Sequence, residues 1–458
     1  MSLEGFFNPK SVAVIGASRT PEKLGYTILE NLKISFKGKI YPINPNATEI
    51  LGLTSYSSVL DIKEPIDLAV IVVPAEIVKK VLEECVKKKI KSIIIISSGF
   101  SEIGEKEREL ELKKLLKGKE IRILGPNCIG IYKKDLDMVF FPRNRLKRPP
   151  DGSISFITQS GAFGSILLDI MSNDGVGVSK FISVGNKIDL DETEFIKYLE
   201  GDLATRCIAI YLESVNNGEE FIKTAKRISS KKPIVCFKAG KTQKGSEAVL
   251  SHTGALAGSA EVYSAAFKQA GIIEAETSEE IFDFAKALAN QPVLKNNKIA
   301  VVTDGGGFGI VATDAAIKYG LELPPLTDES IKALKAFLPR YAITKNPIDL
   351  TGDATVERYK NALEVVLKDK NISGIVCIAL MQIPTLTDEI VDVIRDAKVF
   401  GKPITVCSAG GQYILERNRK LESFGIPVYP TPERAVKALS ILHEYENILK
   451  RESKEAKK

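Results

Sequence analysis

The sequence has 458 residues, and its contents of 44% hydrophobic and 27% charged residues are those of a soluble globular protein. A chain of this length is expected to form roughly two or three domains. The formal net charge is only +6, and acidic and basic residues are interleaved, which argues against a nucleic-acid partner. No apolar stretch approaches the ~20 residues of a membrane helix, and the N-terminus resembles no signal peptide. We therefore expect a cytoplasmic protein that does not contact a membrane.

Predicted strands and helices alternate from the N-terminus onward, which is typical of α/β folds with parallel sheets. An apolar run at 11–15 leads into the turn Gly16-Ala17-Ser18. Further strands are predicted at 39–43, 68–73, 92–96 and 121–124, and a helix at 77–88. The polar, proline-containing segment 133–152 is predicted to be a linker, which makes residues 1–132 the first domain. Six cysteines are scattered mostly in apolar runs, so we expect buried free thiols.

The remainder of the sequence is duplicated. Four segments recur in the same order: 157–164 as 302–309, 188–190 as 348–350, 207–210 as 377–380, and 232–240 as 402–410. This predicts two domains of flavodoxin-like size at 153–292 and 297–445, followed by a basic tail at 446–458. The first copy carries about 16 extra residues between Gly240 and Gly271, and a long insertion of this kind is predicted to be a functional or disordered loop.

The turn at Gly16 follows a strand and precedes a helix, so its backbone amides could hold a pyrophosphate. By itself this pattern leaves a tight turn without a ligand open. An NAD site needs an acidic residue at the end of the second strand, but that strand ends Ile43-Asn44-Pro45. The phosphorylated ribose of CoA would be repelled by a carboxylate at this place. Arg19 and Lys23 instead offer positive charge near the phosphates.

Five short motifs carry a resemblance to a known family. They are Gly16-Ala17-Ser18, Asn44-Pro45-Asn46, Val73-Pro74-Ala75, Ser97-Ser98-Gly99-Phe100 and Gly125-Pro126-Asn127-Cys128. They resemble the CoA-binding domain of the NDP-forming acyl-CoA synthetases, the group that contains succinyl-CoA synthetase, and the likeness extends to about Leu442. The resemblance implies an N-terminal Rossmann-like CoA-binding domain followed by two flavodoxin-like parallel-sheet domains. It implies that CoA, as a substrate, contacts Gly16, Ala17, Ser18, Arg19, Lys23, Asn44, Pro45, Val73, Pro74, Ser98, Gly99, Phe100 and Asn127.

The sequence contains only two histidines. His443 lies in a helical stretch and is predicted to be structural. His252 lies in the insertion of the first copy, where residue type alone leaves a solvated histidine and a catalytic one equally open. The segment Ser251-His252-Thr253-Gly254 resembles the phosphohistidine segment of the family, and Glu213 matches the glutamate that orients the histidine. The resemblance thus implies that His252 is the nucleophile that takes up a phosphoryl group.

A phosphoryl group without a metal ion needs backbone donors, which helix N-termini supply. One such helix begins after Thr158, and we predict that Gln159, Ser160, Gly161 and Ala162 bind phosphate. In the family a second helix converges on the same phosphate. The matching stretch here is 382–385, with Thr385 as the candidate, although it lacks the glycines of succinyl-CoA synthetase. The repeated turn 305–307 could equally be structural.

The resemblance implies that acyl-CoA, phosphate and ADP are converted into the free acid, CoA and ATP through an acyl phosphate and phospho-His252 on a mobile loop. No ATP-grasp domain is recognisable, so a separate β subunit is expected to hold ADP or ATP with Mg²⁺, in an α2β2 heterotetramer, and no metal is expected on this chain. A CoA-binding regulatory protein without catalysis and a nicotinamide dehydrogenase are the alternatives. The resemblance to the family favours acetyl or another small acyl group. The identity of the acyl group and the choice between ADP and GDP stay open at this point.

Overall fold

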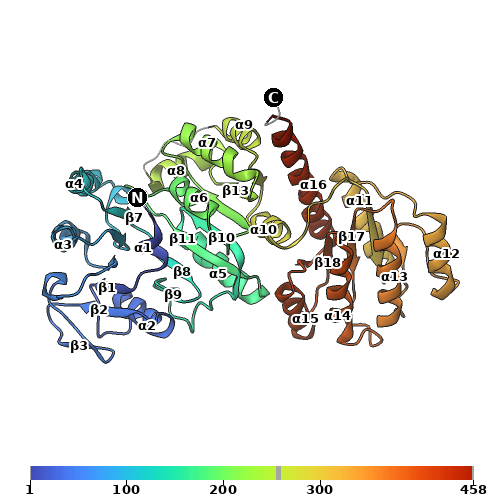
Figure 1. The fold of residues 1–458 in the computed structure, drawn as a ribbon, viewed down its shortest axis with the longest axis horizontal. Coiled ribbons are helices and arrows are strands. Elements are labelled where there is room, and N and C mark those ends of the chain that lie inside the picture. Colours follow the sequence, from blue (N-terminus) through green and yellow to red (C-terminus); the bar gives the residue numbers. More distant parts are fainter. Residues whose placement is uncertain (1, 254–258, 456–458) are drawn as a thin grey trace. The chain divides into compact units, whose positions relative to one another are not determined.

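The computed structural model describes residues 2–253 and 259–455, without the side chains of residues 250–253 and 455. The chain divides into two compact units. The N-terminal unit comprises residues 1–172 and 178–276, and the C-terminal unit comprises residues 173–177 and 277–458 (Figure 1). Within the described ranges, no helix combines the length and apolar character needed to cross a bilayer.

The first sheet of the N-terminal unit is a five-stranded parallel sheet. Across the sheet its strands are β2 (Lys39–Ile43), β1 (Ser11–Ile15), β5 (Leu68–Ile71), β6 (Ser92–Ile95) and β7 (Arg122–Leu124). The other elements here are α1 (Glu4–Phe7), α2 (Leu24–Ser35), β3 (Glu49–Ile50), β4 (Leu53–Thr54), η1 (Val59–Asp61), α3 (Ala75–Lys87), η2 (Ser101–Ile103) and α4 (Lys106–Leu116). Strands β1, β5 and β6 are buried at every position, which explains their unbroken apolar runs. The predicted Rossmann-like fold is confirmed.

The second sheet of this unit has seven strands. Their order is β14 (Ile273–Ala275), β13 (Ile234–Lys238), β12 (Cys207–Leu212), β10 (Asp151–Thr158), β11 (Val178–Ser183), β8 (Ile131–Lys133) and β9 (Leu136–Asp137). Its helices are α5 (Gly161–Asp174), α6 (Glu192–Glu200), α7 (Gly218–Ser229), α8 (Gln243–Thr253) and α9 (Ala260–Ala270). Strands β10 to β14 pair in parallel, as predicted, whereas β8 runs antiparallel to β11. Part of the segment predicted as a linker therefore extends this sheet.

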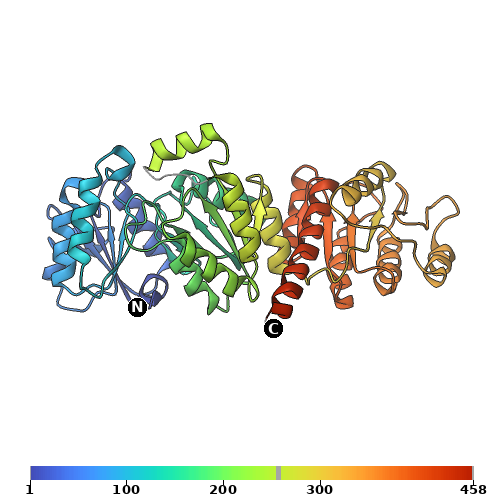
Figure 2. The same ribbon diagram turned by 90° about the horizontal axis from the view of Figure 1, so that it is seen from above.

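The C-terminal unit contains a five-stranded parallel sheet. Its order is β16 (Ile348–Asp349), β15 (Ile299–Thr303), β17 (Gly374–Ile378), β18 (Ile404–Cys407) and β19 (Val428–Tyr429). The helices are α10 (Glu280–Asn290), α11 (Gly306–Lys318), α12 (Asp328–Phe337), α13 (Val356–Lys368), α14 (Glu389–Asp396), η3 (Ala397–Phe400), α15 (Gln412–Ser423) and α16 (Pro432–Glu455). Figure 2 shows this sheet between helices on both sides, and α16 packs beside α10 and α11. The tail predicted from residue 446 continues α16 as helix through Glu455.

The two copies of the duplicated fold are related by their strand registers. Thr158 pairs with Tyr211 in the first copy, and its counterpart Thr303 pairs with Ile378 in the second. Glu213 therefore corresponds to Leu380, and the predicted match of 207–210 with 377–380 is wrong by three residues. The match of 188–190 with 348–350 is also wrong, because β11 and β16 pair in a different register. The match of 232–240 with 402–410 is confirmed, since β13 and β18 occupy the same place.

The insertion of the first copy is helical where a loop was predicted. Helix α8 spans Gln243–Thr253. Thr242 begins it: its Oγ1 accepts a hydrogen bond from the Gly245 amide (3.0 Å), as a helix-capping threonine does. The Ser246 hydroxyl also donates to the Gly240 carbonyl (2.8 Å), which ties the first turn of α8 to the end of β13. Glycine and polar residues near the start of the insertion had favoured a loop, but local capping forms a helix.

Candidate active site

A cavity of about 700 Å³ lies at the carboxyl ends of the strands of the N-terminal unit. It is the place where ligands bind in open α/β sheets, because neighbouring crossovers leave the sheet in opposite directions there. Residues from both sheets line it. The predicted site residues among them are Gly16, Ala17, Ser18, Lys23, Asn44, Val73, Pro74, Ser98, Asn127, Gln159, Ser160, Gly161 and Ala162. The fold thus brings the predicted CoA residues and the predicted phosphate residues to one cavity.

The turn after β1 is held open toward this cavity. Gly16 has a φ of +94°, and a Cβ there would lie 2.4 Å from the Val72 carbonyl oxygen. A Cβ on Gly25 would lie 2.0 Å from the carbonyl oxygen of Gly16, so only glycine lets α2 approach the turn. The Asn44 amide donates to the Ala17 carbonyl (2.7 Å). Asn44 therefore holds the turn where a dinucleotide site would carry an acid.

Five of the residues predicted to bind CoA or phosphate are not among the lining residues of the cavity. Arg19 is exposed and donates to the Asn46 carbonyl at 3.4 Å, and Pro45 is exposed beside it. The Gly99 amide donates to Glu102, and the Phe100 side chain is buried in the core of the first sheet. A ring packed in that core has no free face for a ligand. The fifth residue, Thr385, belongs to the C-terminal unit.

Eight further residues line the cavity and had not been predicted as site residues. They are Leu24, Gly25, Val72, Ile96, Ser97, Cys128, Ile129 and Phe140. Cys128 is 2% exposed, its thiol donates to the Ile95 carbonyl (3.4 Å), and burial raises the pKa of this thiol to about 12. All six cysteines are buried and free, as predicted. Phe140 lies in the segment predicted as a linker, so no strand or helix pattern singled it out.

Glu213 is positioned by the residue that follows β10. Gln159 Oε1 accepts hydrogen bonds from the amides of Glu213 (2.9 Å) and Ser214 (3.0 Å), while its Nε2 donates to the Ser214 hydroxyl (3.0 Å). The Gln159 backbone amide donates to the Tyr211 carbonyl (3.2 Å). Gln159 thus fixes the end of β12. Helix geometry leaves the amides of Gly161, Ala162 and Phe163 at the start of α5 without a helical acceptor. The Phe163 amide donates to the Ser160 hydroxyl (3.3 Å), so the amides of Gly161 and Ala162 are the candidates for phosphate binding.

Three charged side chains are buried close to Glu213. Glu213 itself is 5% exposed. Burial, followed by the charge of Glu213 and a hydrogen bond to it, raises the pKa of Tyr211. Lys187 donates to Glu192 (3.1 Å) and to the Ser214 carbonyl (2.6 Å). Lys238 lies 4.7 Å from the centre of the Tyr263 ring, and burial lowers its pKa, an effect that the charge of Glu213 opposes. Sequence patterns gave no signal for either lysine.

The side chain of His252 lies outside the described residues, as do Gly254 and its neighbours through 258. The backbone of residue 252 belongs to α8. Helix α8 packs against η2 of the first domain. In the sequence, η2 begins three residues after Ser98, which lines the cavity.

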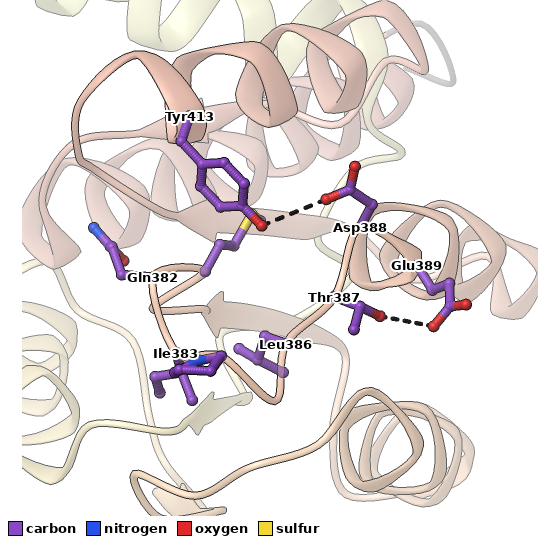
Figure 3. Close-up of a pocket in the computed structure, with 9 residues that line it drawn as sticks. Gln382, Ile383, Leu386, Thr387, Asp388, Glu389 and Tyr413 are labelled. Carbon is purple, nitrogen blue, oxygen red and sulfur yellow. Dashed lines mark hydrogen bonds between the residues drawn. The ribbon is translucent and has the colours of Figure 1, made fainter.

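A second cavity, of about 630 Å³, lies in the C-terminal unit (Figure 3). Its lining residues are Met381, Gln382, Ile383, Pro384, Leu386, Thr387, Asp388, Glu389 and Tyr413. The Tyr413 hydroxyl donates to Asp388 (3.5 Å) and the Thr387 hydroxyl donates to Glu389 (2.7 Å). Thr385 is not part of the lining, and its hydroxyl donates to the Ala354 carbonyl. The predicted phosphate stretch thus contributes Gln382, Ile383 and Pro384 to this cavity, whereas the Thr385 side chain bonds to a neighbouring loop.

Three family descriptions match consecutive parts of the chain. "CoA binding domain" matches residues 10–134, "Succinyl-CoA ligase like flavodoxin domain" matches 151–288, and "Ligase-CoA domain" matches 299–447. These matches follow the three sheets of the structure in order.

Among similar proteins, the acetate–CoA ligase (ADP-forming) I subunit alpha of Pyrococcus furiosus is 43% identical, over 97% of this chain and 98% of its own. The chain spans only 64% of acetate–CoA ligase (ADP-forming) I of Archaeoglobus fulgidus, with 42% identity over 98% of this chain. A solved structure of dinucleotide forming acetyl-coenzyme A synthetase 1 of Ca. Korarchaeum cryptofilum, in complex with phosphate and ADP, is 38% identical with a TM-score of 0.91, over 98% of this chain and 99% of that one. The chain belongs to the family of ADP-forming acetate–CoA ligase alpha subunits.

Proposed function

We propose that the chain is the alpha subunit of an ADP-forming acyl-CoA synthetase, which converts acyl-CoA, phosphate and ADP into acid, CoA and ATP. The observation that carries this proposal is the common cavity of the N-terminal unit. The turn at Gly16 and the start of α5 at Gly161 line the same cavity. An acyl-CoA whose pyrophosphate lies at the Gly16 turn would present its thioester carbonyl group to a phosphate held at the start of α5.

The reaction then follows in three steps. A phosphate oxygen attacks the thioester carbonyl, the C–S bond breaks, and CoA leaves as the thiol. An imidazole nitrogen of His252 attacks the phosphorus of the acyl phosphate, and the P–O bond to the acyl group breaks, which releases the carboxylate. The amides of Gly161 and Ala162 stabilise the negative charge of the phosphoryl oxygens. Glu213 orients the imidazole and stabilises its cationic phosphorylated form.

The third step transfers the phosphoryl group to ADP. An oxygen of the ADP β-phosphate attacks the phosphorus and the P–N bond breaks, which regenerates His252. We propose that ADP and Mg²⁺ are held by a separate ATP-grasp β subunit, in an α2β2 assembly, and that the segment carrying His252 moves between the two sites. The names of similar proteins, an alpha subunit and a synthetase bound to phosphate and ADP, support a partner of this kind.

The test reconstitutes the chain with its β subunit and measures ATP formed from acetyl-CoA, phosphate and ADP. His252→Ala is expected to abolish ATP formation while CoA release in the first step continues, because only the later steps need the imidazole. His443→Ala is the matched control. His443 is the other histidine of the sequence, and its Nδ1 lies 3.1 Å from the Leu294 carbonyl oxygen, far along the chain from the cavity residues. ATP synthesis at the wild-type rate by His252→Ala would refute the phosphohistidine mechanism.

A further inference from the structure

The segment 133–150, which crosses from β8 to β10, is fastened on both sides of Phe140. The Asn31 side-chain amide donates to the carbonyls of Val139 (2.7 Å) and Phe141 (3.1 Å). The Arg148 guanidinium donates to the same two carbonyls, at 3.4 Å and 2.8 Å. Asn31 is fully buried. The two residues that flank Phe140 are thus each held by two hydrogen bonds, so the backbone of Phe140 has a fixed place.

A buried carboxylate anchors this segment. The Asp137 side chain has no exposed surface, and it pairs with Arg148 (2.9 Å) and with Arg143 (2.8 Å). The Arg148 side chain is itself only 5% exposed. Buried pairs of this kind are costly to break, because one charge would remain buried without a partner. The segment therefore resists displacement by a ligand.

Phe140 uses this fixed position to form part of the cavity wall. Its ring packs against the hydrophobic core on one side and lines the cavity on the other. The neighbouring ring of Phe141 lies 4.9 Å away between centroids, but Phe141 is not among the lining residues. Of the two adjacent phenylalanines, only Phe140 lines the cavity, so Phe141 can serve as a matched control.

Ile129 lines the same cavity, beside the start of α5. It is 5% exposed, and its Cγ2 would lie 2.7 Å from a Cβ placed on Gly161. Its backbone amide donates to the Ser183 hydroxyl (3.2 Å), which fixes its position on the second sheet. An aliphatic side chain thus lies directly against the glycine whose amide we assign to phosphate. Any group bonded to the reacting carbonyl carbon must share this space.

We infer that Ile129 and Phe140 contact the acyl group of the thioester and restrict it to short aliphatic chains. This inference rests on the proposed function, since it takes the reacting carbonyl to lie beside Gly161. Both side chains are apolar and carry no charge that could pair with a second carboxylate, so unbranched or small branched monocarboxylic acyl groups fit against them better than dicarboxylic ones. Phe140 removes the volume that an aryl group would need.

The first test measures kcat/KM of the reconstituted enzyme for acetyl-, isobutyryl- and phenylacetyl-CoA. Phe140→Ala is expected to raise the ratio of phenylacetyl-CoA to acetyl-CoA at least tenfold, since one methylene group in an apolar pocket changes specificity by about 10- to 200-fold. Phe140→Leu should have a smaller effect in the same direction. Phe141→Ala, the matched control, should leave the ratio within about twofold. Equal ratios in Phe140→Ala and Phe141→Ala would overturn the inference.

A second test separates this inference from the proposed function. Calorimetry on the chain measures binding of two unreactive thioether analogues, S-ethyl-CoA and S-phenethyl-CoA, together with CoA. The wild type should prefer the S-ethyl compound, Phe140→Ala should lose or reverse that preference, and affinity for CoA itself should stay within about twofold. If the reconstituted wild type forms no ATP but Phe140→Ala reverses the binding preference, the proposed function fails while the assignment of Phe140 to the acyl group stands. If ATP forms but Phe140→Ala keeps the binding preference of the wild type, the assignment of Phe140 to the acyl group is wrong.

Discussion

Gln159 shows how one side chain can set the position of another at a candidate active site. Its carbonyl oxygen takes the amide hydrogens of Glu213 and Ser214, so the strand end that carries the carboxylate cannot rotate freely. We had predicted a phosphate contact for Gln159, and it does line the cavity. Its hydrogen bonds also make it a positioning residue, because they hold the backbone of Glu213, which we propose orients the phosphorylated imidazole.

We predict that Gln159→Ala slows phosphorylation of His252 about tenfold or more. Two buried amides would lose their acceptor, at a cost of about 1–3 kcal/mol, and 1.4 kcal/mol corresponds to a factor of ten in rate. Single-turnover labelling of His252 by ATP, with the β subunit present, measures this rate.

The conservative variant Gln159→Glu separates an effect on the position of Glu213 from a loss of folding stability. Gln159→Glu keeps an acceptor for both amides but adds a negative charge beside Glu213, so thermal stability should recover. Its phosphorylation rate should rise toward low pH, where the new carboxyl group is protonated. A wild-type rate in Gln159→Ala would show that Glu213 does not depend on this contact.

At the scale of single elements, the turn after β15 repeats the turn after β10 with one changed residue. Asp304 takes the place of Gln159, and its carboxylate accepts the Leu380 amide at 3.1 Å and 3.0 Å. Leu380 occupies the place of Glu213. The second copy thus keeps the hydrogen bond that fixes the strand end, but it has lost the carboxylate that the bond positions in the first copy. Desolvation raises the pKa of Asp304 from 3.8 to about 6.

This raised pKa predicts how the stability of the C-terminal unit depends on pH. Because folded Asp304 holds its proton more tightly than unfolded Asp304, the free energy of unfolding should decrease from about pH 4 to about pH 6 and then level off. Asp304→Asn keeps an acceptor for Leu380 and cannot ionise. It should be more stable than the wild type at pH 7, by on the order of 3 kcal/mol, and similar at pH 4.

Urea unfolding at several pH values, followed by hydrogen exchange of residues 374–380, measures this difference. Asp314→Asn is the control, since Asp314 is exposed on α11. The same decrease with pH in wild type and Asp304→Asn would contradict the assignment to Asp304.

The elements also show what the sequence could predict. The buried strands of the parallel sheets were predictable because most of their residues are apolar, and the duplication because glycine turns recur at fixed places. Strands β8 and β9 were missed because two or three residues carry no periodic signal. The second role of Gln159 and the position of Phe140 in the cavity lining were missed for a different reason. The partners that define their roles, Glu213 and Asn31, lie far away in the sequence and are brought near only by strand register and packing.

For the whole molecule, helix α10 shows where the chain divides. The sequence places it after β14, and we had assigned it to the middle domain, yet its side chains pack within the C-terminal unit. Lys286 pairs with Glu422 (2.9 Å), and both side chains are under 10% exposed. The Lys286 ammonium also lies 4.3 Å from the centre of the Tyr429 ring. The position of this helix along the chain, before the second copy, could not tell which sheet it covers.

We therefore expect that a fragment of residues 277–458 folds by itself and unfolds cooperatively. A fragment of residues 297–458 should be less stable by about 3–5 kcal/mol or more, because Glu422 would stay buried without Lys286. Burial already raises the pKa of Glu422 with its partner in place. Chemical unfolding followed by circular dichroism measures both fragments, and Lys286→Met in the longer fragment tests the ion pair alone. Equal stability of the two fragments would show that α10 does not belong to this unit.

The burial of Cys128 has a consequence for thiol chemistry in the cavity. Burial raises the pKa of the Cys128 thiol to about 12, so this residue is a thiol rather than a thiolate at neutral pH. A thiolate is the form that attacks thioesters and disulfides, so this residue can neither capture the acyl group from an acyl-CoA nor exchange with an oxidised CoA disulfide. In the proposed reaction, the departing thiol of CoA would then be the reactive sulfur at the site. We expect the protein to tolerate mild oxidants that inactivate proteins with an activated cysteine beside their substrate.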